Sequence, residues 1–436
     1  ADQLPPEVLD DARTILADTI GILCSANRRT AVRTGLAALA PTGGACTVVG
    51  HGRVAPAEVA AFLNGIGGHD IELDDSHSPS RTHPAAVIVA AALAAVEHVG
   101  EASLGDLLDG IVAGYEVQAR VSKAMGRNEQ YDRGFHPSAV CGAIGAAAAA
   151  GRILGLSVDE MRSCIGLAAS QSSGLLSYAD DPYHMQKSFQ TGVAARNGVT
   201  AALFAKAGYK AAPNVLAGEH DVLRPFGGPA ADPSKLTVGL GTHFEIGQTS
   251  LKRHASCNLT HAAVDALLLL MANPAITAQS IQHIHIELPF KGAQRVDGNM
   301  LWTHNIQYVV AIAAFERHVA LEHFTPEWTG NAEVQALAAR VTVEGSVELD
   351  ERFPEQKGAR LTVTTADGEF VQQVDSPRGS PREPLTDAEL KQKFEFLSGV
   401  AMSPEDSAEL WERLRHGAIE DPVGAITARL GRKAGR

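Results

Sequence analysis

The chain has 436 residues and carries 37 lysines and arginines against 50 aspartates and glutamates, a formal net charge of −13. This acidic balance argues against a general nucleic-acid binder, which needs a basic surface for the phosphates. Hydrophobic residues make up 45% and charged residues 20% of the chain, which excludes a disordered protein. At about 150 residues per domain, the length predicts two or three folded domains.

Targeting segments and disulfides are not expected. The apolar stretch 262–272 contains Asp265 and is too short to span a bilayer. The first residues lack a basic region followed by an apolar run, so we expect neither a signal peptide nor a membrane partner. The five cysteines are widely spaced and form no C-x-x-C pair. This spacing argues against a disulfide framework or a zinc site and favours the reducing cytoplasm.

Helical periodicity dominates the first 260 residues. Apolar residues recur at helical spacing in seven segments, residues 8–23, 57–66, 85–99, 103–125, 138–154, 158–170 and 191–207. The segment 138–154 consists almost entirely of alanine, glycine and other small residues. Because such a helix lacks bulk on every face, it is stable only where other helices approach it closely. We therefore expect it to be central and buried.

The pattern changes after about residue 277. Alternating polar and apolar residues predict strands at 282–288 and 340–347, and Ala366-Asp367-Gly368 predicts a hairpin between 360–365 and 369–374. Further helices are predicted at 306–315, from a capping box at Thr386 to 397, and at 404–414. We expect a mainly α protein with a helical domain (1–262 and 386–436) and a smaller α+β domain (263–385). The cleft between two such domains is a favoured ligand site.

Ionisable residues interrupt the apolar sequence in four places, of which two precede buried helices. Residues 69–83 hold four carboxylates and three histidines, which could bind a metal ion, transfer protons or merely cap the next helix. His136 precedes the small-residue helix, where the positive end of the helix dipole disfavours the charged imidazole. A neutral imidazole is a competent general base. The alternative is a capping or core histidine.

The other two places bring cations to helix starts. Lys187 could bind a carboxylate, although a single lysine usually lies at the surface. Lys252 and Arg253 could hold an anion, with His261 about one turn into the following helix, or they could form a solvated connector. For Cys257 we favour a role in lining a polar pocket over that of a nucleophile. Fixed cations would stabilise the enolate-like state formed when a proton is removed next to a carboxylate.

Taken in order, these segments resemble the MmgE/PrpD family, which includes 2-methylcitrate dehydratase, cis-aconitate decarboxylase and iminodisuccinate epimerase. The resemblance runs from about residue 8 to 394 and rests on stretches such as GHDIELDDSHSPSRTHP, GFHPSAVCGAIGAAAAA, KSFQTGVAARNGVTAALFAKAGY and LKRHASCNLTHAAVDA. It implies a large all-helical domain, a smaller α+β lid and a homodimer. It also implies a pocket between the domains that needs no metal or organic cofactor.

The resemblance implies roles for individual residues. His136, His83 and Tyr308 match proton-transfer positions. The positions expected to bind substrate or line the pocket are Lys187, Lys252, Glu72, Asp75, Ser76 and His261, to which we add Arg253. Glu72 and Asp75 are expected to orient His83 and its neighbours. Glu72 stands where aspartate is usual and Ser76 where threonine is common, and such changes in the pocket wall bear on the choice of substrate.

These inferences predict a cytoplasmic, cofactor-independent lyase of the 2-methylcitrate dehydratase type. It would act on a small di- or tricarboxylate by proton abstraction and loss of water. Epimerisation or decarboxylation through the same carbanion, on an iminodisuccinate-like or cis-aconitate-like acid, stays open. A metal-dependent hydrolase built on residues 72–83 and a non-catalytic helical scaffold are the less favoured alternatives.

Overall fold

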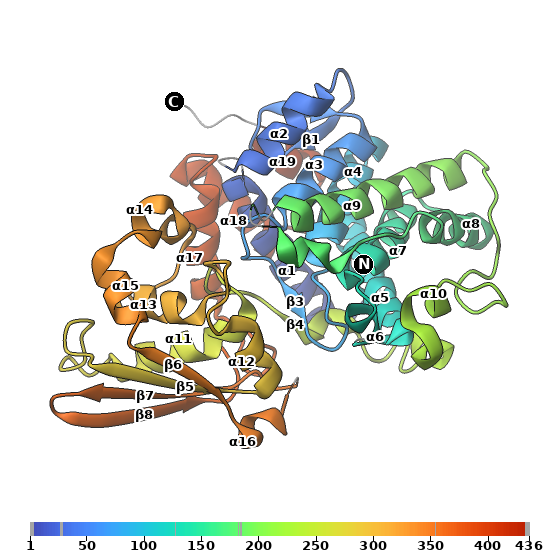
Figure 1. Ribbon diagram of the computed structural model, residues 1–436. Helices are drawn as coiled ribbons and strands as arrows, with labels where there is room; N and C mark the ends of the chain where they lie inside the picture. The colour runs from blue at the N-terminus through green and yellow to red at the C-terminus, as the bar shows by residue number, and fades with distance from the viewer. Residues whose placement is uncertain are drawn as a thin grey trace. The chain divides into compact units, whose positions relative to one another are not determined.

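The computed structural model describes residues 4–26, 29–126, 128–181, 183, 185–353 and 355–431 and is mainly α-helical (Figure 1). The chain divides into two compact units, one of Ala1–Thr249 with Thr386–Arg436 and one of Ser250–Leu385. The first boundary therefore differs from the predicted 262–263. The reason is that helix α11 (Asn258–Leu270) packs on strands of the second unit.

The small-residue helix α7 (Pro137–Ile153) is central to the helical unit, as predicted. Its residues from Pro137 to Gly151 are all buried, and α4 (Ala85–Val99), α5 (Leu104–Met125) and α9 (Met185–Lys206) pack around it (Figure 1). A Cβ atom placed on Gly198 would lie 2.3 Å from the Cβ of Ala146, so α9 and α7 are in backbone contact there. Helix α3 (Ala57–Gly67) covers another face of α9.

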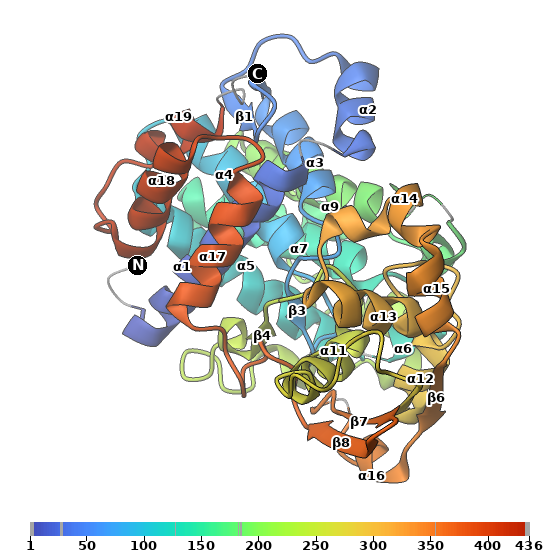
Figure 2. The ribbon, with the colours of Figure 1, turned by 90° about the vertical axis from the view of Figure 1, so that its left-hand side faces the viewer.

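The C-terminal helices belong to the helical unit. Figure 2 shows α17 (Asp387–Ser398) beside α1 (Pro6–Ala26), with α18 (Pro404–His416) against both. Nζ of Lys393 lies 2.6 Å from Oδ1 of the buried Asp18. The predicted capping box is formed, because the Thr386 side chain accepts from the Glu389 amide and the Glu389 carboxylate accepts from the Thr386 amide.

Short elements complete this unit. They are α2 (Thr30–Leu39), the hairpin β1 (Cys46–Val48) and β2 (Arg53–Ala55), β3 (Ser76–His77), α6 (Glu129–Asp132), α8 (Val158–Ala169), α10 (Leu223–Gly227), α19 (Gly424–Leu430) and 3₁₀ turns that include η1 (Leu176–Asp180) and η4 (Glu245–Gln248). The two-residue strand β4 (Thr249–Ser250) spans the unit boundary.

The second unit is built on a four-stranded sheet in the order β6-β5-β7-β8. Its strands are β5 (His283–Leu288), β6 (Val341–Gly345), β7 (Ala359–Thr365) and β8 (Gly368–Val374). Strands β5 and β6 are parallel, whereas β5–β7 and β7–β8 are antiparallel. Alternate residues of β5 are buried, which confirms the predicted period-2 pattern. All four predicted strands are present.

Helices cover the apolar residues of this sheet. The core joins Ile284, Ile286 and Leu361 of the strands with apolar residues of α11 and of α13 (Ile306–Glu316). The remaining helices are α12 (Phe290–Val296), η5 (Leu321–Phe324), α14 (Pro326–Thr329), α15 (Ala332–Ala338) and α16 (Val347–Asp350). Across both units, none of the helices in the described residues has the length and apolar character to cross a membrane.

Candidate active site

The loop between α3 and α4 buries four carboxylates, Asp70, Glu72, Asp74 and Asp75. A buried carboxylate is destabilising unless it is paired. Two of the four, Asp70 and Glu72, are paired with cations from other elements. Nε of Arg29 lies 2.9 Å from Oδ2 of Asp70, and Nζ of Lys187 on α9 contacts Oε1 of Glu72.

The backbone of this loop is strained. Glu72 has φ 51° and Arg81 has φ 55°, in the left-handed region that residues other than glycine rarely adopt. Such strain costs on the order of 1–3 kcal/mol per residue and is concentrated at functional sites in known proteins. The buried ion pair between Glu72 and Lys187 holds the loop in this conformation.

Asp75 holds the start of α4. Its Oδ1 accepts from the Ala85 amide at 3.0 Å, and its Oδ2 accepts from the Tyr115 hydroxyl at 2.9 Å. Burial, with the neighbouring Asp74 adding to it, raises the pKa of Asp75 well above its usual value. The backbone oxygen of Asp75 also contacts the His83 imidazole. The orienting role of Asp75 and Glu72 stays a prediction.

The Asp74 carboxylate contacts two histidines, His69 and His83. Its Oδ2 lies 2.6 Å from Nδ1 of His69 and 3.2 Å from Nδ1 of His83, and the Asp75 backbone oxygen lies 2.5 Å from the same His83 nitrogen. Because these oxygens only accept, Nδ1 carries the hydrogen in both rings. In the neutral form, Nε2 of each ring therefore presents a lone pair. Sequence analysis missed Asp74 and His69, since nothing in the pattern separates them from the other residues of an acidic loop.

His136 is fully buried at the N-terminus of α7. Its Nδ1 lies 2.8 Å from Oε1 of Gln190, whose amide nitrogen donates to the backbone oxygen of Leu175 at 3.0 Å. This second bond fixes the orientation of the amide, so Nδ1 of His136 donates and Nε2 keeps its lone pair. Burial lowers the pKa of His136 well below its usual value, and nearby His69 adds to the effect.

These side chains form one cluster within the helical unit. The ring of His69 lies 5.0 Å from that of His83 and 6.0 Å from that of His136, and the His136 ring lies 4.6 Å from that of Tyr178 on η1. The Ser138 hydroxyl of α7 accepts from the His83 amide at 3.0 Å and joins the loop to the helix. The structure thus brings together four sequence-predicted site residues, His83, His136, Lys187 and Glu72, and places the predicted Ser76 in β3 of the same loop.

A metal ion does not fit the acidic loop well. Potential ligand atoms of His69, Asp74 and His83 lie within 4.8 Å of one another. The two Nδ1 atoms, however, carry hydrogens directed at oxygen atoms and have no lone pair to offer on that side. We read the group as a hydrogen-bonded triad and assign no metal site to it.

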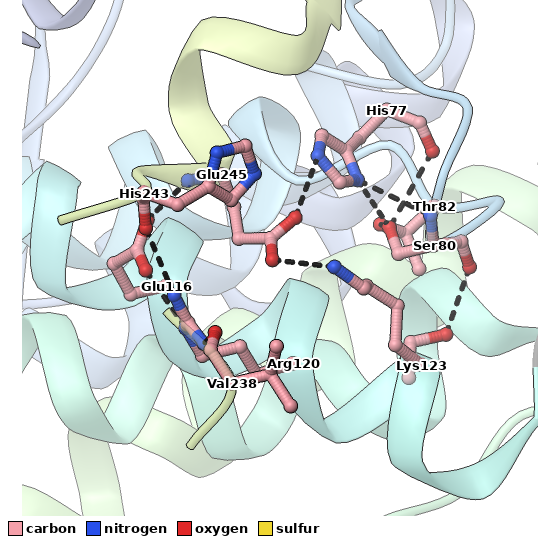
Figure 3. Close-up of polar contacts among 10 residues, drawn as sticks. His77, Ser80, Thr82, Glu116, Arg120, Lys123, Val238, His243 and Glu245 are labelled. Carbon is pink, nitrogen blue, oxygen red and sulfur yellow. Dashed lines mark hydrogen bonds and ion pairs between the residues drawn. The ribbon is translucent and has the colours of Figure 1, made fainter. Parts of the chain in front are cut away.

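A second buried cluster, shown in Figure 3, accounts for another histidine of the loop. Nδ1 of His77 accepts from the Ser80 amide at 3.3 Å, so its hydrogen lies on Nε2, which is 3.4 Å from Oε2 of Glu245. Oε1 of Glu245 accepts from Nζ of Lys123 on α5 at 2.6 Å. This cluster fastens the segment before the unit boundary to α5. His77 therefore has the opposite tautomer to the three site histidines and a structural role.

The remaining predicted residues belong to the second unit. Lys252 and His261 are buried, whereas Arg253 is exposed and has Nη1 3.7 Å from Oδ1 of Asp265. Burial raises the pKa of Tyr308 to about 12, and its hydroxyl donates to the backbone oxygen of His323. Within this unit the Tyr308 proton is thus engaged in a structural bond. Catalytic and binding roles for these four residues stay predictions.

Two family models match this chain over most of its length. The family model for the MmgE/PrpD N-terminal domain matches residues 1–232, and that for the C-terminal domain matches residues 254–415. The chain belongs to the MmgE/PrpD family. The first matched region contains His83, His136 and Lys187, and the second contains His261 and Tyr308. The resemblance inferred from short stretches of sequence is confirmed.

Named relatives of this MmgE/PrpD chain are enzymes, and the chain is an enzyme of this family. It is 29% identical to a cis-aconitate decarboxylase of Aspergillus terreus over 91% of this chain and 86% of the relative. It is 30% identical to the cis-aconitate decarboxylase-like protein oryM of Aspergillus oryzae over 92% of this chain and 88% of the relative. A mitochondrial 2-methylcitrate dehydratase of Yarrowia lipolytica is 23% identical over 62% of this chain and 54% of the relative.

Proposed function

We propose that this chain is a cofactor-independent lyase that acts on a small di- or tricarboxylate through a carbanion next to a carboxylate. The observation that carries the proposal is the group of His83, His136 and Lys187, in which His136 and Lys187 are buried and His83 is half-buried. Each imidazole is held in one tautomer with Nε2 available, an arrangement suited to proton transfer. The ammonium group stabilises negative charge that develops during the reaction.

Within this class, we propose decarboxylation of an unsaturated acid of the cis-aconitate type as the first candidate. Two fungal relatives named for this reaction align over 91% and 92% of the chain, against 62% for the dehydratase. In this reaction the bond to one carboxylate breaks and CO2 leaves. The electron pair stays on the substrate, delocalised toward a remaining carboxylate, until an imidazole delivers a proton to carbon.

The second candidate is dehydration of a 2-methylcitrate-like hydroxy acid. It is favoured by the presence of more than one imidazole in the cluster, because dehydration needs a base and an acid together. His83 or His136 would take the proton from carbon, and the other would protonate the departing hydroxyl. Epimerisation of a related dicarboxylate would begin with the same removal of a proton from carbon and end with delivery of a proton to the opposite face of that carbon.

We further propose that the α+β unit acts as a lid and that its Lys252, Arg253, His261 and Tyr308 take part in substrate binding or proton transfer. The support is the resemblance of these positions to the family pattern, the match of the C-terminal family model over His261 and Tyr308, and the burial of Lys252. A Lys252→Met variant is expected to lose at least about tenfold in kcat/KM, about 1.4 kcal/mol of transition-state binding. Unchanged kinetics would contradict the role of Lys252.

The choice of reaction is tested by offering the enzyme cis-aconitate, 2-methylcitrate, citrate, malate and an aspartate-derived acid in D2O and following products by NMR. Release of CO2 with deuterium gained at carbon supports decarboxylation. An unsaturated product without CO2 supports dehydration, and deuterium exchange without net product supports epimerisation. Failure to turn over any of these acids would contradict the proposed substrate class.

The same samples separate the lyase from a metal-dependent hydrolase. Because the ring nitrogens that face Asp74 carry hydrogens, we expect turnover to be unchanged by EDTA. We also expect elemental analysis of the active protein to find no stoichiometric metal. Loss of activity on chelation, restored by one added metal, would favour the hydrolase.

A further inference from the structure

Two buried nitrogen atoms in the cluster have no hydrogen-bond partner among the described residues. They are Nε2 of His69 and Nε2 of His136, and both rings are fully buried. The rings lie 6.0 Å apart with 16° between their planes. A buried polar atom without a partner is destabilising, so a ligand that reached these two atoms would gain the missing hydrogen bonds.

The hydrogen bonds of the opposite ring atoms decide what that ligand must bring. Nδ1 of His69 donates to Asp74, and Nδ1 of His136 donates to Gln190. Both Nε2 atoms of the neutral rings are therefore acceptors. A carboxylate is also an acceptor only, so it cannot be held by this pair unless a proton is present between them.

We propose that His69 is a further substrate-binding residue of this site, and that a polycarboxylate binds to the His69–His136 pair together with one proton taken from solvent. The inference rests on the proposed function, since it assumes that the ligand of this cluster is a carboxylate. It assigns to His69, positioned by Asp74, a role that the family resemblance did not imply.

The charges around the pair explain why the proton arrives with the ligand. The titratable and polar groups that face it are Asp74 and His83 from the loop, Lys187 and Gln190 from α9, and Tyr178 from η1. Burial lowers the pKa of His69 to about 4, with Asp74 opposing the shift and Lys187 adding to it. Both rings are thus neutral near pH 7 when the site is empty. A carboxylate within reach raises their pKa because it stabilises the charged ring.

The captured proton also balances decarboxylation. Breaking the carbon–carbon bond releases CO2 and leaves an electron pair on carbon, and one proton is needed to complete the product. The proton that enters with the substrate is the one that Nε2 then delivers, after which the imidazole is neutral again. A hydroxy acid can instead donate its own hydroxyl hydrogen to one Nε2 and would bind with less proton uptake.

Titration calorimetry with tricarballylate tests the proposal. This saturated tricarboxylate has neither a double bond nor a hydroxyl and cannot react. Near pH 8, heats measured in buffers of different ionisation enthalpy give the number of protons taken up. We expect about one proton per ligand bound, and an affinity that weakens about tenfold for each unit rise in pH.

Variants of His69 distinguish proton uptake on binding from the hydrogen bond between residue 69 and the ligand. His69→Gln places an amide donor near the Nε2 position, so we expect binding within about tenfold of wild type but an uptake below half a proton. His69→Leu offers no hydrogen bond and should bind at least tenfold more weakly. The matched control is His77→Gln, at a buried histidine of opposite tautomer, which should keep the wild-type uptake.

The outcomes are distinct. Binding of tricarballylate by the wild-type enzyme without proton uptake would overturn this inference and leave the polycarboxylate site intact. Full uptake in His69→Gln, or equal loss of uptake in His77→Gln, would overturn the assignment to His69. Absence of binding by tricarballylate and by cis-aconitate would contradict the proposed function itself.

Discussion

At the scale of single residues, the chemistry of each histidine is decided by the contact of its second ring nitrogen. His83 and His136 have Nδ1 directed at an oxygen acceptor, which leaves Nε2 as the reactive atom. His77 has Nδ1 accepting from a backbone amide and turns an N–H group toward Glu245. Three histidines that look alike in the sequence thus divide into two with a lone pair on Nε2 and one with a hydrogen on Nε2.

His136→Asn tests the reactive role with the least disturbance. The asparagine amide can still donate to Gln190, whereas the atom that corresponds to Nε2 is lost. We expect kcat to fall by at least ~100-fold, the low end for general acid–base catalysis, with thermal unfolding little changed. Steady-state kinetics and a melting curve measure the two effects. Near-wild-type turnover would exclude His136 as a proton-transfer group.

Sequence analysis identified His83, His136, Lys187 and Glu72 as a group because they match family positions. It predicted that Glu72 and Asp75 orient His83 and its neighbours, and the structure adds a contact of the Asp74 carboxylate with His83. The two aspartates are adjacent in the chain, and their side chains contact different partners because one is needed at the start of α4. Composition and spacing contain no information on that choice.

At the scale of elements, the contact between α7 and α9 depends on glycine. Replacing glycine by alanine in a helix normally gains up to about 1 kcal/mol. At Gly198 the new Cβ would lie 2.3 Å from Ala146 Cβ and 2.6 Å from the Ala147 backbone nitrogen, which cannot move independently. We expect Gly198→Ala to be destabilising by about 1–3 kcal/mol, the usual cost of overpacking a core.

Thermal unfolding of Gly198→Ala measures this loss. The control is Gly424→Ala in α19, where a Cβ would meet nothing within 4 Å. That variant should be as stable as wild type or slightly more stable. Equal melting temperatures for the two variants would show that α7 and α9 have room to separate.

The connection between β3, η4 and α5 predicts a pH dependence of stability. Burial lowers the pKa of His77 from 6.5 to about 4, so the unfolded chain binds more protons at this residue between those values. Stability from His77 is therefore complete above pH 6.5 and is lost as the pH falls toward 4. Between pH 7.5 and pH 5 the loss is about 2 kcal/mol.

His77→Gln removes this titration. Between pH 7.5 and pH 5, we expect the free energy of unfolding of the wild type to fall by about 2 kcal/mol relative to that of the variant. Chemical unfolding at the two pH values measures it. A constant difference would mean that His77 titrates normally in the folded protein.

At the scale of the whole molecule, an acidic chain is built as two units with different cores. Small aliphatic residues pack around α7 in one unit, and a four-stranded sheet covered by α11 and α13 forms the other. The net charge of −13 opposes an anionic ligand at long range. The proposed carboxylate substrate therefore requires local hydrogen bonds and charge from Lys187 and the imidazoles to offset this repulsion.

The family resemblance also predicts the assembly. We expect a homodimer, with a mass of twice the 45.8 kDa chain in size-exclusion chromatography with light scattering. The measurement is made at two protein concentrations, because a specific dimer keeps its mass on moderate dilution. A mass of one chain at both concentrations would contradict the prediction.

The sequence by itself determined the long helices, the four strands, the buried character of α7 and the family. These features follow from periodicity and from the small size of side chains, which are local properties of the chain. Only the tertiary structure decided which carboxylate orients which histidine, which nitrogen carries each hydrogen, and that α11 belongs to the second unit. Those outcomes depend on partners distant in sequence, such as Gln190 for His136 and Lys187 for Glu72. A hydrogen bond between distant residues leaves no periodic signal in the sequence.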